Sequence, residues 1–223
     1  MNTLPLLRYV IAGQLRRNFI ITPKGKVLLD VPGGSLLYTA TGMAVWETGI
    51  GLIGRVGEDF SQEWLASIAR HGMDIRGIHI LPESVDLRYF SAYSNGGMTA
   101  ENPVSHFARL GIPYPKNLLG YAPPSVVIGS RTRPGLLTIR QNDFPSDYLD
   151  ATAAHLCPLD FLSHTLMPSV LRRGHIQTLT LDPSTSYMNP TFWDDIPVLL
   201  NGLTAFLCSE EKLQSLFQGR STD

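Results

Sequence analysis

Apolar positions follow two different spacings along the chain, and their alternation predicts strands that take turns with helices. Short apolar runs at 6–12, 20–21 and 27–29 predict strands. From 35 to 48 the apolar residues recur at helical spacing, and Gly49 then stops the helix. The nearly continuous apolar run at 50–56 predicts a buried parallel strand, and an amphipathic helix is expected over 60–71. This order predicts a parallel sheet covered by helices.

The strand and helix order breaks between about residues 86 and 124. An alternating segment at 87–93 predicts an exposed strand, and a polar stretch containing several prolines follows. A long irregular segment inside a compact domain is usually a binding loop or lid. Beyond it we expect strands at 125–129, 136–140, 177–181 and 203–207, and helices at 148–154, 161–173, 190–200 and 210–217.

Composition and charge narrow the classes of partner. With 43% hydrophobic and 17% charged residues, the 223-residue chain is expected to fold as one α/β domain or two small ones. A formal charge of -1 leaves no basic field for nucleic acid, and no apolar run approaches the roughly 20 residues of a membrane span. Cys157 and Cys208 show no paired spacing, which favours a reducing compartment. We therefore expect a cytoplasmic protein without nucleic-acid or membrane partners.

Common catalytic motifs give little support to hydrolase or dehydrogenase chemistry. The chain contains no His-Glu-x-x-His, Cys-x-x-Cys or Gly-x-Ser-x-Gly sequence. Gly49, Gly51 and Gly54 match the spacing of a dinucleotide fingerprint, but that motif follows a strand and opens a helix. Here a helix precedes the glycines and a strand contains them, so no nicotinamide or flavin site is expected.

Two adjacent glycines, Gly33 and Gly34, stand directly before the helix predicted at 35–48. Glycine lets the backbone approach a ligand closely and adopt positive φ, and the first amides of a helix lack partners within the helix. The pair predicts a place where a polar small molecule binds, although a plain tight turn would also use two glycines.

Three segments give the chain a resemblance to a known family. The first is the strand ending at Gly13, with Asn18 after it. The second is the glycine pair with Tyr38 in the helix that follows. The third is the run from Gly51 to Phe60, Gly-Leu-Ile-Gly-Arg-Val-Gly-Glu-Asp-Phe, which His-Gly-Met-Asp follows at 71–74. This arrangement resembles the PfkB/ribokinase-like family of sugar and nucleoside kinases over nearly the whole chain.

The resemblance implies a ribokinase-like three-layer α/β fold, in which a central, mostly parallel sheet is covered by helices and carries a small β lid. Residues 1–223 would form a single incomplete domain, with lid elements at about 15–30 and 86–124. It also implies ATP-dependent phosphorylation of a sugar or nucleoside hydroxyl with Mg²⁺. The substrate-binding positions would be Asn18, Gly33, Gly34, Tyr38, Arg88 and Asn102. Asp182 and Glu211 would lie in the phosphate and Mg²⁺ region.

The parts of the family that transfer phosphate are not found in these 223 residues. The family's base is an Asp in a Gly-Ala-Gly-Asp run, and the chain contains no such run. Its Asn-x-x-Glu element would fall at 208–211 or one residue further on. The Asn is absent in either register, and the Glu position holds Glu211 in the first and Lys212 in the second. We therefore expect a C-terminally truncated relative that lacks the nucleotide-binding part and is inactive alone.

Other interpretations of these residues stay open. Asn18 could be an exposed strand residue, Tyr38 could belong to the core or its rim, and Asp182 could simply form a turn. In the lid, Asn102, His106, Arg109 and Tyr121 could meet a substrate, or their polarity could reflect solvent exposure alone. The chain could also be a non-catalytic sugar-binding module that forms a homodimer through the lid, or an unstable truncation.

Overall fold

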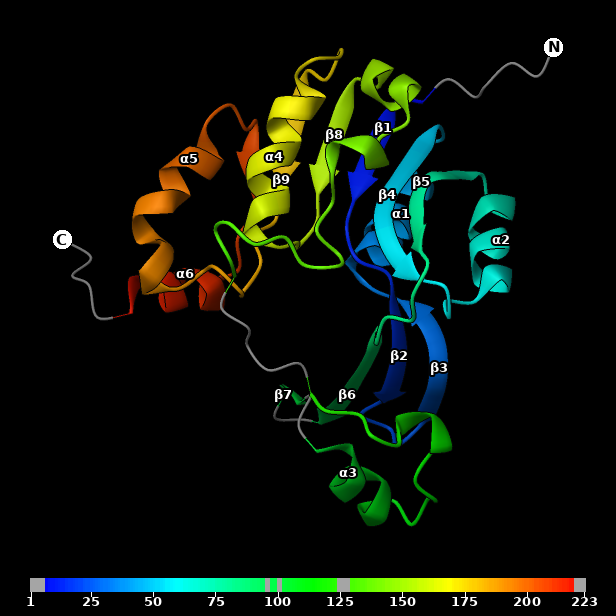
Figure 1. The fold of residues 1–223 in the computed structure, drawn as a ribbon. Coiled ribbons are helices and arrows are strands. Elements are labelled where there is room, and N and C mark those ends of the chain that lie inside the picture. The colour runs from blue at the N-terminus through cyan, green and yellow to red at the C-terminus, as the bar shows by residue number, and fades with distance from the viewer. Residues whose placement is uncertain (1–6, 95–96, 100–101, 124–128, 219–223) are drawn as a thin grey trace.

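A computed structural model describes residues 7–94, 97–99, 102–123 and 129–218, and its body is built on a six-stranded parallel sheet (Figure 1). The strand order is β10-β9-β8-β1-β4-β5. The strands are β1 (Tyr9–Ala12), β4 (Ile50–Gly57), β5 (Met73–Leu81), β8 (Ala153–Leu156), β9 (Thr178–Leu181) and β10 (Ala205–Phe206). All of β4 is buried, as its continuous apolar sequence predicts.

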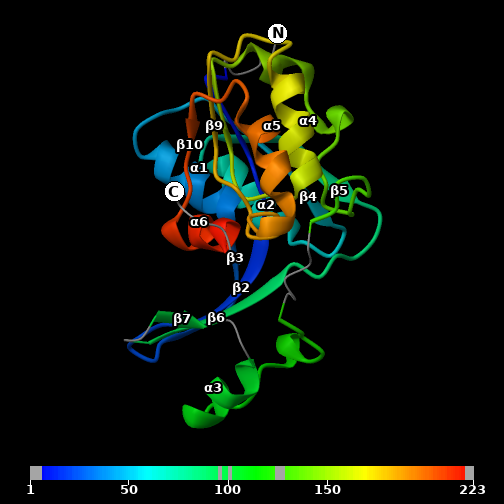
Figure 2. The ribbon, with the colours of Figure 1, turned by 90° about the vertical axis from the view of Figure 1, so that its left-hand side faces the viewer.

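Helices cover both faces of this sheet because side chains alternate along each strand. In β1, Val10 and Ala12 join a core cluster with Met167 and Leu171 of α4 (Phe161–Leu171). Ile11 points the other way. It packs in a second cluster with residues of α1 (Ser35–Ala44) and α2 (Gln62–Arg70). Figure 2 shows the body strands between α4 and α1.

A third cluster of apolar residues lies toward the end of the described chain. It combines Phe161 of α4 with residues of α5 (Ile196–Leu200) and α6 (Glu210–Phe217). Short 3₁₀ helices connect the larger elements: η1 (Lys116–Leu118), η2 (Gln141–Asp143), η3 (Ser146–Asp150) and η4 (Pro190–Asp195).

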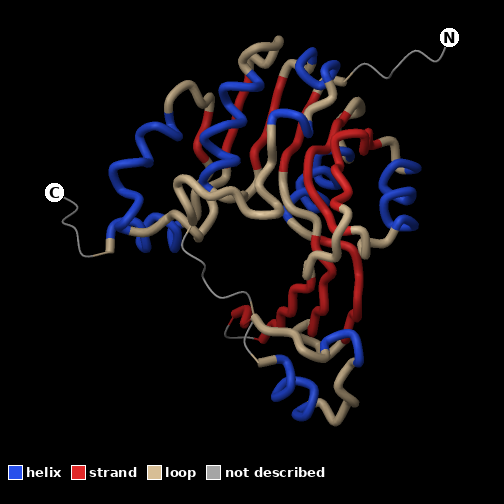
Figure 3. Tube along the Cα trace, in the orientation of Figure 1, coloured by secondary structure: helices blue, strands red, loops and turns tan. Residues whose placement is uncertain are grey.

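A second, four-stranded sheet projects from one end of the body (Figure 3). Its order is β3-β2-β6-β7, formed by β2 (Arg16–Ile21), β3 (Val27–Gly33), β6 (Arg88–Ser94) and β7 (Gly97–Thr99). Phe19 and Phe90 turn to one face, where they pack with Phe107 of α3 (Pro103–Arg109) and Leu118. We call this sheet with α3 and η1 the lid.

The structure confirms the predicted parallel sheet covered by helices and corrects several of its elements. The strand expected at 136–140 is wrong, because this segment is a turn and loop whose Leu136 carbonyl binds Arg55. The helix expected at 148–154 is also wrong, because η3 ends at Asp150 and β8 follows. Residues 125–128 of the strand expected at 125–129 lie outside the described residues. Among the described helices, none has the length and apolar character that crossing a membrane requires.

Candidate substrate-binding site

The glycine pair lies where the lid joins the body, at the end of β3 and the start of α1. Gly34 has φ of +99° and stands at the N-cap of α1, without a side-chain cap. A Cβ on Gly34 would collide with the Gln14 carbonyl oxygen and lie 2.9 Å from the Arg16 amide nitrogen. That carbonyl accepts a hydrogen bond from the Leu36 amide of α1, at 3.1 Å. The close approach of two backbone segments therefore requires glycine here.

Asn18 and Tyr38 meet directly beside Gly33. Asn18 Nδ2 donates to the Tyr38 hydroxyl at 2.6 Å, although 20 residues separate them. A Cβ on Gly33 would lie 2.7 Å from Asn18 Cγ and 2.9 Å from the Tyr38 oxygen. Four of the residues predicted from the sequence, Asn18, Gly33, Gly34 and Tyr38, thus form one group, which we call the Asn18 group.

Asn18 Oδ1 is a buried oxygen for which the described residues provide no hydrogen-bond partner. Asn18 is only 5% exposed, whereas Tyr38 is 57% exposed. The Tyr38 oxygen accepts from Asn18, so its proton remains available to a ligand. The pair therefore offers one acceptor and one donor side by side. A buried polar atom without a partner costs free energy, which a bound hydroxyl group would recover.

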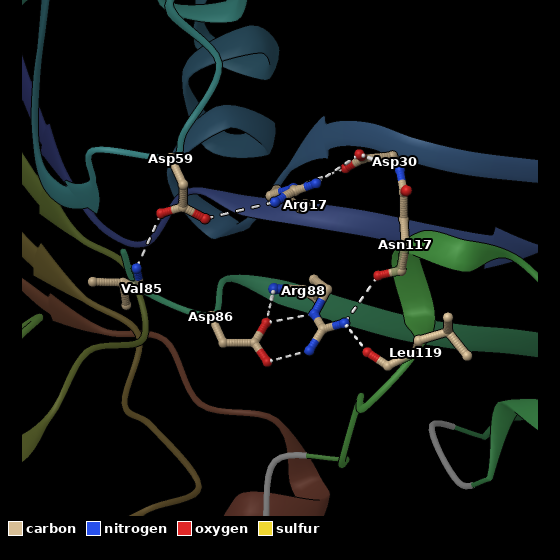
Figure 4. A network of polar contacts seen from close by, with 8 residues as sticks. All are labelled: Arg17, Asp30, Asp59, Val85, Asp86, Arg88, Asn117 and Leu119. Carbon is tan, nitrogen blue, oxygen red and sulfur yellow. Dashed lines mark hydrogen bonds and ion pairs between the residues drawn. The ribbon is translucent and has the colours of Figure 1, made fainter. Parts of the chain in front are cut away.

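Arg88 and Asn102 do not join this group in the structure. Asn18 is paired with Tyr89 in the parallel ladder, while Arg88 is paired with Arg17 and lies on the opposite face. Arg88 donates to Asp86 and to the carbonyls of Asn117 and Leu119 (Figure 4). Asn102 caps α3, since its Oδ1 accepts from the Val104 amide at 3.2 Å. Both side chains therefore hold lid segments in place.

A network of ion pairs connects the lid to the body (Figure 4). Arg17 of β2 makes a two-pronged hydrogen bond to Asp30, at 2.9 and 2.7 Å. It also lies 3.6 Å from Asp59, which follows β4, and Asp59 accepts from the Val85 amide at 3.0 Å. Because Arg17 belongs to β2 of the lid and Asp59 follows β4 of the body, this ion pair holds the strand that carries Asn18 against the body.

Two carboxylates beside these arginines, Asp30 and Asp86, have lowered pKa values. The hydrogen bond from Arg17 lowers the pKa of Asp30, and the one from Arg88 lowers the pKa of Asp86. Asp30 also accepts from Asn117 Nδ2, at 3.0 Å. The ionised state of these acids thus supports the lid geometry at neutral pH.

Asp182 and Glu211, the residues expected near phosphate and Mg²⁺, lie in different elements and have different surroundings. Asp182 follows β9, at the carboxyl edge of the sheet, and bonds the Lys212 ammonium group of α6. Glu211 is exposed in the first turn of α6. The described residues contain no group of three His, Cys, Asp or Glu side chains arranged for a metal ion. Because Asp182 is paired with a lysine and the described residues around Glu211 offer no such group, the phosphate and Mg²⁺ region expected at these two residues stays a prediction.

Sequence reasoning missed the partners that hold the site. Glu58 and Asp59 invite interpretation as a helix cap, but Ser61 caps α2 and Asp59 binds across to Val85. Arg55 lies in the same motif and forms a buried ion pair with Asp143, which is 88 residues away. Such long-range pairs leave no signal in local spacing.

The structure is similar to solved kinases over nearly its whole length. It superposes on a PfkB protein from Polaromonas sp. JS666 with a TM-score of 0.57 and 15% identity, covering 96% of this chain and 70% of that one. It superposes on the nucleoside kinase of Burkholderia thailandensis in complex with inosine with a TM-score of 0.60 and 11% identity, covering 94% of this chain and 63% of that one. For the ribokinase of Cryptococcus neoformans in complex with ADP, the TM-score is 0.57 and the identity 15%, with 96% of this chain and 61% of that one covered.

The chain has the ribokinase-like fold. The solved structures thus confirm the fold that the three sequence segments predicted. They also confirm that the chain resembles the PfkB/ribokinase-like kinases. No protein-family model matches the sequence. A cytidine kinase from Thermococcus kodakarensis is 29% identical over 115 residues. This match covers 51% of the chain and only 41% of the length of the cytidine kinase.

Proposed function

We propose that these residues form the substrate side of a PfkB-like kinase and bind a sugar, or the sugar of a nucleoside, at the Asn18 group. The observation that carries the proposal is the buried, unpartnered Oδ1 of Asn18 beside the exposed Tyr38 hydroxyl. Two neighbouring sugar hydroxyls match this pair, since one donates to Asn18 and the other accepts from Tyr38. Gly33 supports the assignment because any side chain there would displace both groups.

Two observations support a sugar or a nucleoside as the substrate: the similar proteins and the hydrogen-bonding groups of Asn18 and Tyr38. The fold is that of proteins described as a nucleoside kinase bound to inosine and as a ribokinase, and the curated relative is described as a cytidine kinase. The neutral Asn18 and Tyr38 pair presents one donor and one acceptor, where a carboxylate would present two acceptors. We propose that this pair selects a substrate that supplies one hydroxyl to each.

We further propose that the 223 residues bind substrate without transferring phosphate. We do not expect Arg88, Asn102, Asp182 or Glu211 to supply a base. The first three are engaged in internal contacts, and Glu211 is exposed in the first turn of α6 and belongs to no described group of three metal-binding side chains. ATP with Mg²⁺ is the phosphoryl donor expected of such kinases, and the solved ribokinase of Cryptococcus neoformans carries ADP. In these residues the Gly-Ala-Gly-Asp sequence of the resembled family is absent.

Calorimetry tests this proposal. The purified 223-residue chain is titrated with ribose, fructose, cytidine and inosine, and then with ATP and Mg²⁺. We expect binding of at least one sugar or nucleoside and no phosphorylated product in a coupled assay. Binding of substrate without any ATP affinity would favour a non-catalytic sugar-binding module. ATP-dependent phosphorylation would overturn the claim about transfer, and no binding in the panel would overturn the assignment of the Asn18 group.

We also propose that two copies pair through the lid. Tyr93 and Met98 lie opposite each other on β6 and β7 and are 42% and 53% exposed. Exposed apolar pairs on a sheet favour association with another surface. Light scattering should give the mass of a dimer for the wild type and of a monomer for Met98→Lys. A monomeric wild type would contradict the pairing.

A further inference from the structure

A small cavity at the tip of the lid collects basic and hydroxyl groups from three segments of the described lid. It has a volume of about 240 Å³ and lies between the turn after β2, the end of β6 and the last turn of α3. Its polar groups include Thr22, His106 and Arg109, and none of the described residues that line it is acidic. We call it the lid-tip pocket.

The donors of this pocket can be assigned from its hydrogen bonds. A guanidinium group only donates, so Arg109 Nη2 donates to His106 Nδ1 at 3.0 Å. The proton of the neutral His106 ring then sits on Nε2. Thr22 Oγ1 accepts from the Lys26 amide at 3.0 Å and keeps its own proton. Three different side chains therefore retain protons to donate, from two segments more than 80 residues apart in the sequence.

Arg109 differs from Arg17 and Arg88 of the same lid in the charge of its hydrogen-bond partner. Each of those two bonds a carboxylate, whereas Arg109 bonds a neutral imidazole. The turn that lines the pocket at Gly25 also carries Lys24 and Lys26. A basic side chain in the last turn of a helix is favoured by the helix dipole alone. That effect explains neither the cavity nor the hydroxyl of Thr22 from a different segment.

We propose that the lid-tip pocket binds a phosphate group. An arginine fork with neighbouring neutral donors is the arrangement that phosphate oxygens prefer, and a net positive cavity attracts them. The pocket is separate from the Asn18 group, because four residues of extended chain from Asn18 to Thr22 span about 13 Å. One sugar does not bridge that distance. A phosphate here would connect the β2–β3 turn with α3 and so stiffen the lid.

The test follows the Arg109 side-chain Nε resonance by NMR while inorganic phosphate replaces chloride at constant ionic strength. We expect a saturable shift in the wild-type chain, and weakening of about tenfold or more in Arg109→Gln, from loss of a charge-assisted contact. In the variant, backbone amides of Thr22 and Gly25 report the binding instead. Lys116→Gln removes one exposed lid charge outside the pocket and should bind as the wild type does. Arg109→Lys should fall between them, because it keeps the charge and loses the fork.

Phosphoserine serves as a second probe and separates the two sources of phosphate. Tighter binding of phosphoserine than of inorganic phosphate would identify an esterified group, and the reverse would identify the free ion. Equal weakening in Arg109→Gln and Lys116→Gln, or a shift that does not saturate with phosphate, would overturn the proposal. The readout does not involve sugar binding, so it stands apart from the function proposed above.

Discussion

Replacing Gly34 with alanine should destabilise the fold, while the same change at Gly42 should stabilise it. Gly34 has φ of +99° and ψ of 161°, a region that is essentially restricted to glycine. Gly42 lies within α1, and a Cβ there would meet nothing within 4 Å. The two substitutions add the same methyl group at the two ends of one helix.

The magnitude at Gly34 has two parts. Holding alanine in this backbone conformation costs about 1–3 kcal/mol. Its Cβ also collides with the Gln14 carbonyl oxygen, and displacing packed backbone costs about 1–3 kcal/mol more. We expect a loss of at least about 2 kcal/mol. At Gly42, alanine gains about 0.5–1 kcal/mol because it restricts the unfolded chain and favours helix.

Urea unfolding followed by circular dichroism measures both changes, with the slope of the transition checked for constancy. The reasoning would be refuted if Gly34→Ala unfolded within about 0.5 kcal/mol of the wild type, a difference typical of an ordinary surface substitution. Loss of stability in Gly42→Ala would equally contradict the open space described for that position.

Two further predictions concern charged groups. Asp143→Ala leaves Arg55, 7% exposed, without its carboxylate, and should lower the unfolding free energy by about 3–5 kcal/mol. The double variant Arg55→Met with Asp143→Leu should recover most of that loss in the same urea assay; equal loss in both would contradict a charge effect. Asp30, Asp74 and Asp86 have lowered pKa values in the folded state. The stability that these three acids contribute is therefore complete above their unfolded pKa of about 4, and it is lost as the pH falls through their folded pKa values. Thermal unfolding measured from pH 7 to pH 2 should show the stability falling mainly below about pH 4. An Asp30→Asn variant should show a shallower fall, and an unchanged acid profile would contradict the Arg17 contact.

The body of the fold could be predicted because local patterns determine it. Periodic apolar positions gave β4 and α2 within two residues of their observed bounds, since burial on one face or both leaves a regular spacing. The same pattern gave the start of α1 but not its end, which lies at Ala44 rather than at 48. The segment at 136–140 was mispredicted because Leu137 and Ile139 pack against the core clusters without joining the sheet. Thr138 and Ile139 are buried there without strand hydrogen bonds.

The candidate site was predictable in part for the same reason. Gly33 and Gly34 are visible as an adjacent pair before a helix, and their neighbours Asn18 and Tyr38 came from the family resemblance. The contacts that orient them, such as Arg17 with Asp30 and Asp59, depend on how two sheets meet. Contacts across a sheet boundary have no fixed sequence spacing, so only the structure assigned Arg88 and Asn102 to holding lid segments.

The affinity of Asn18→Leu for the tightest ligand of the calorimetric panel tests the substrate site most directly. Leucine keeps about the same volume and removes the buried Oδ1, so a sugar hydroxyl loses its acceptor. We predict binding weaker by about tenfold or more, which corresponds to about 1.4 kcal/mol, with circular dichroism showing an intact fold. Asn102→Asp keeps the cap of α3 and should bind within about twofold of the wild type. Undiminished binding by Asn18→Leu would contradict the placement of the substrate at the Asn18 group.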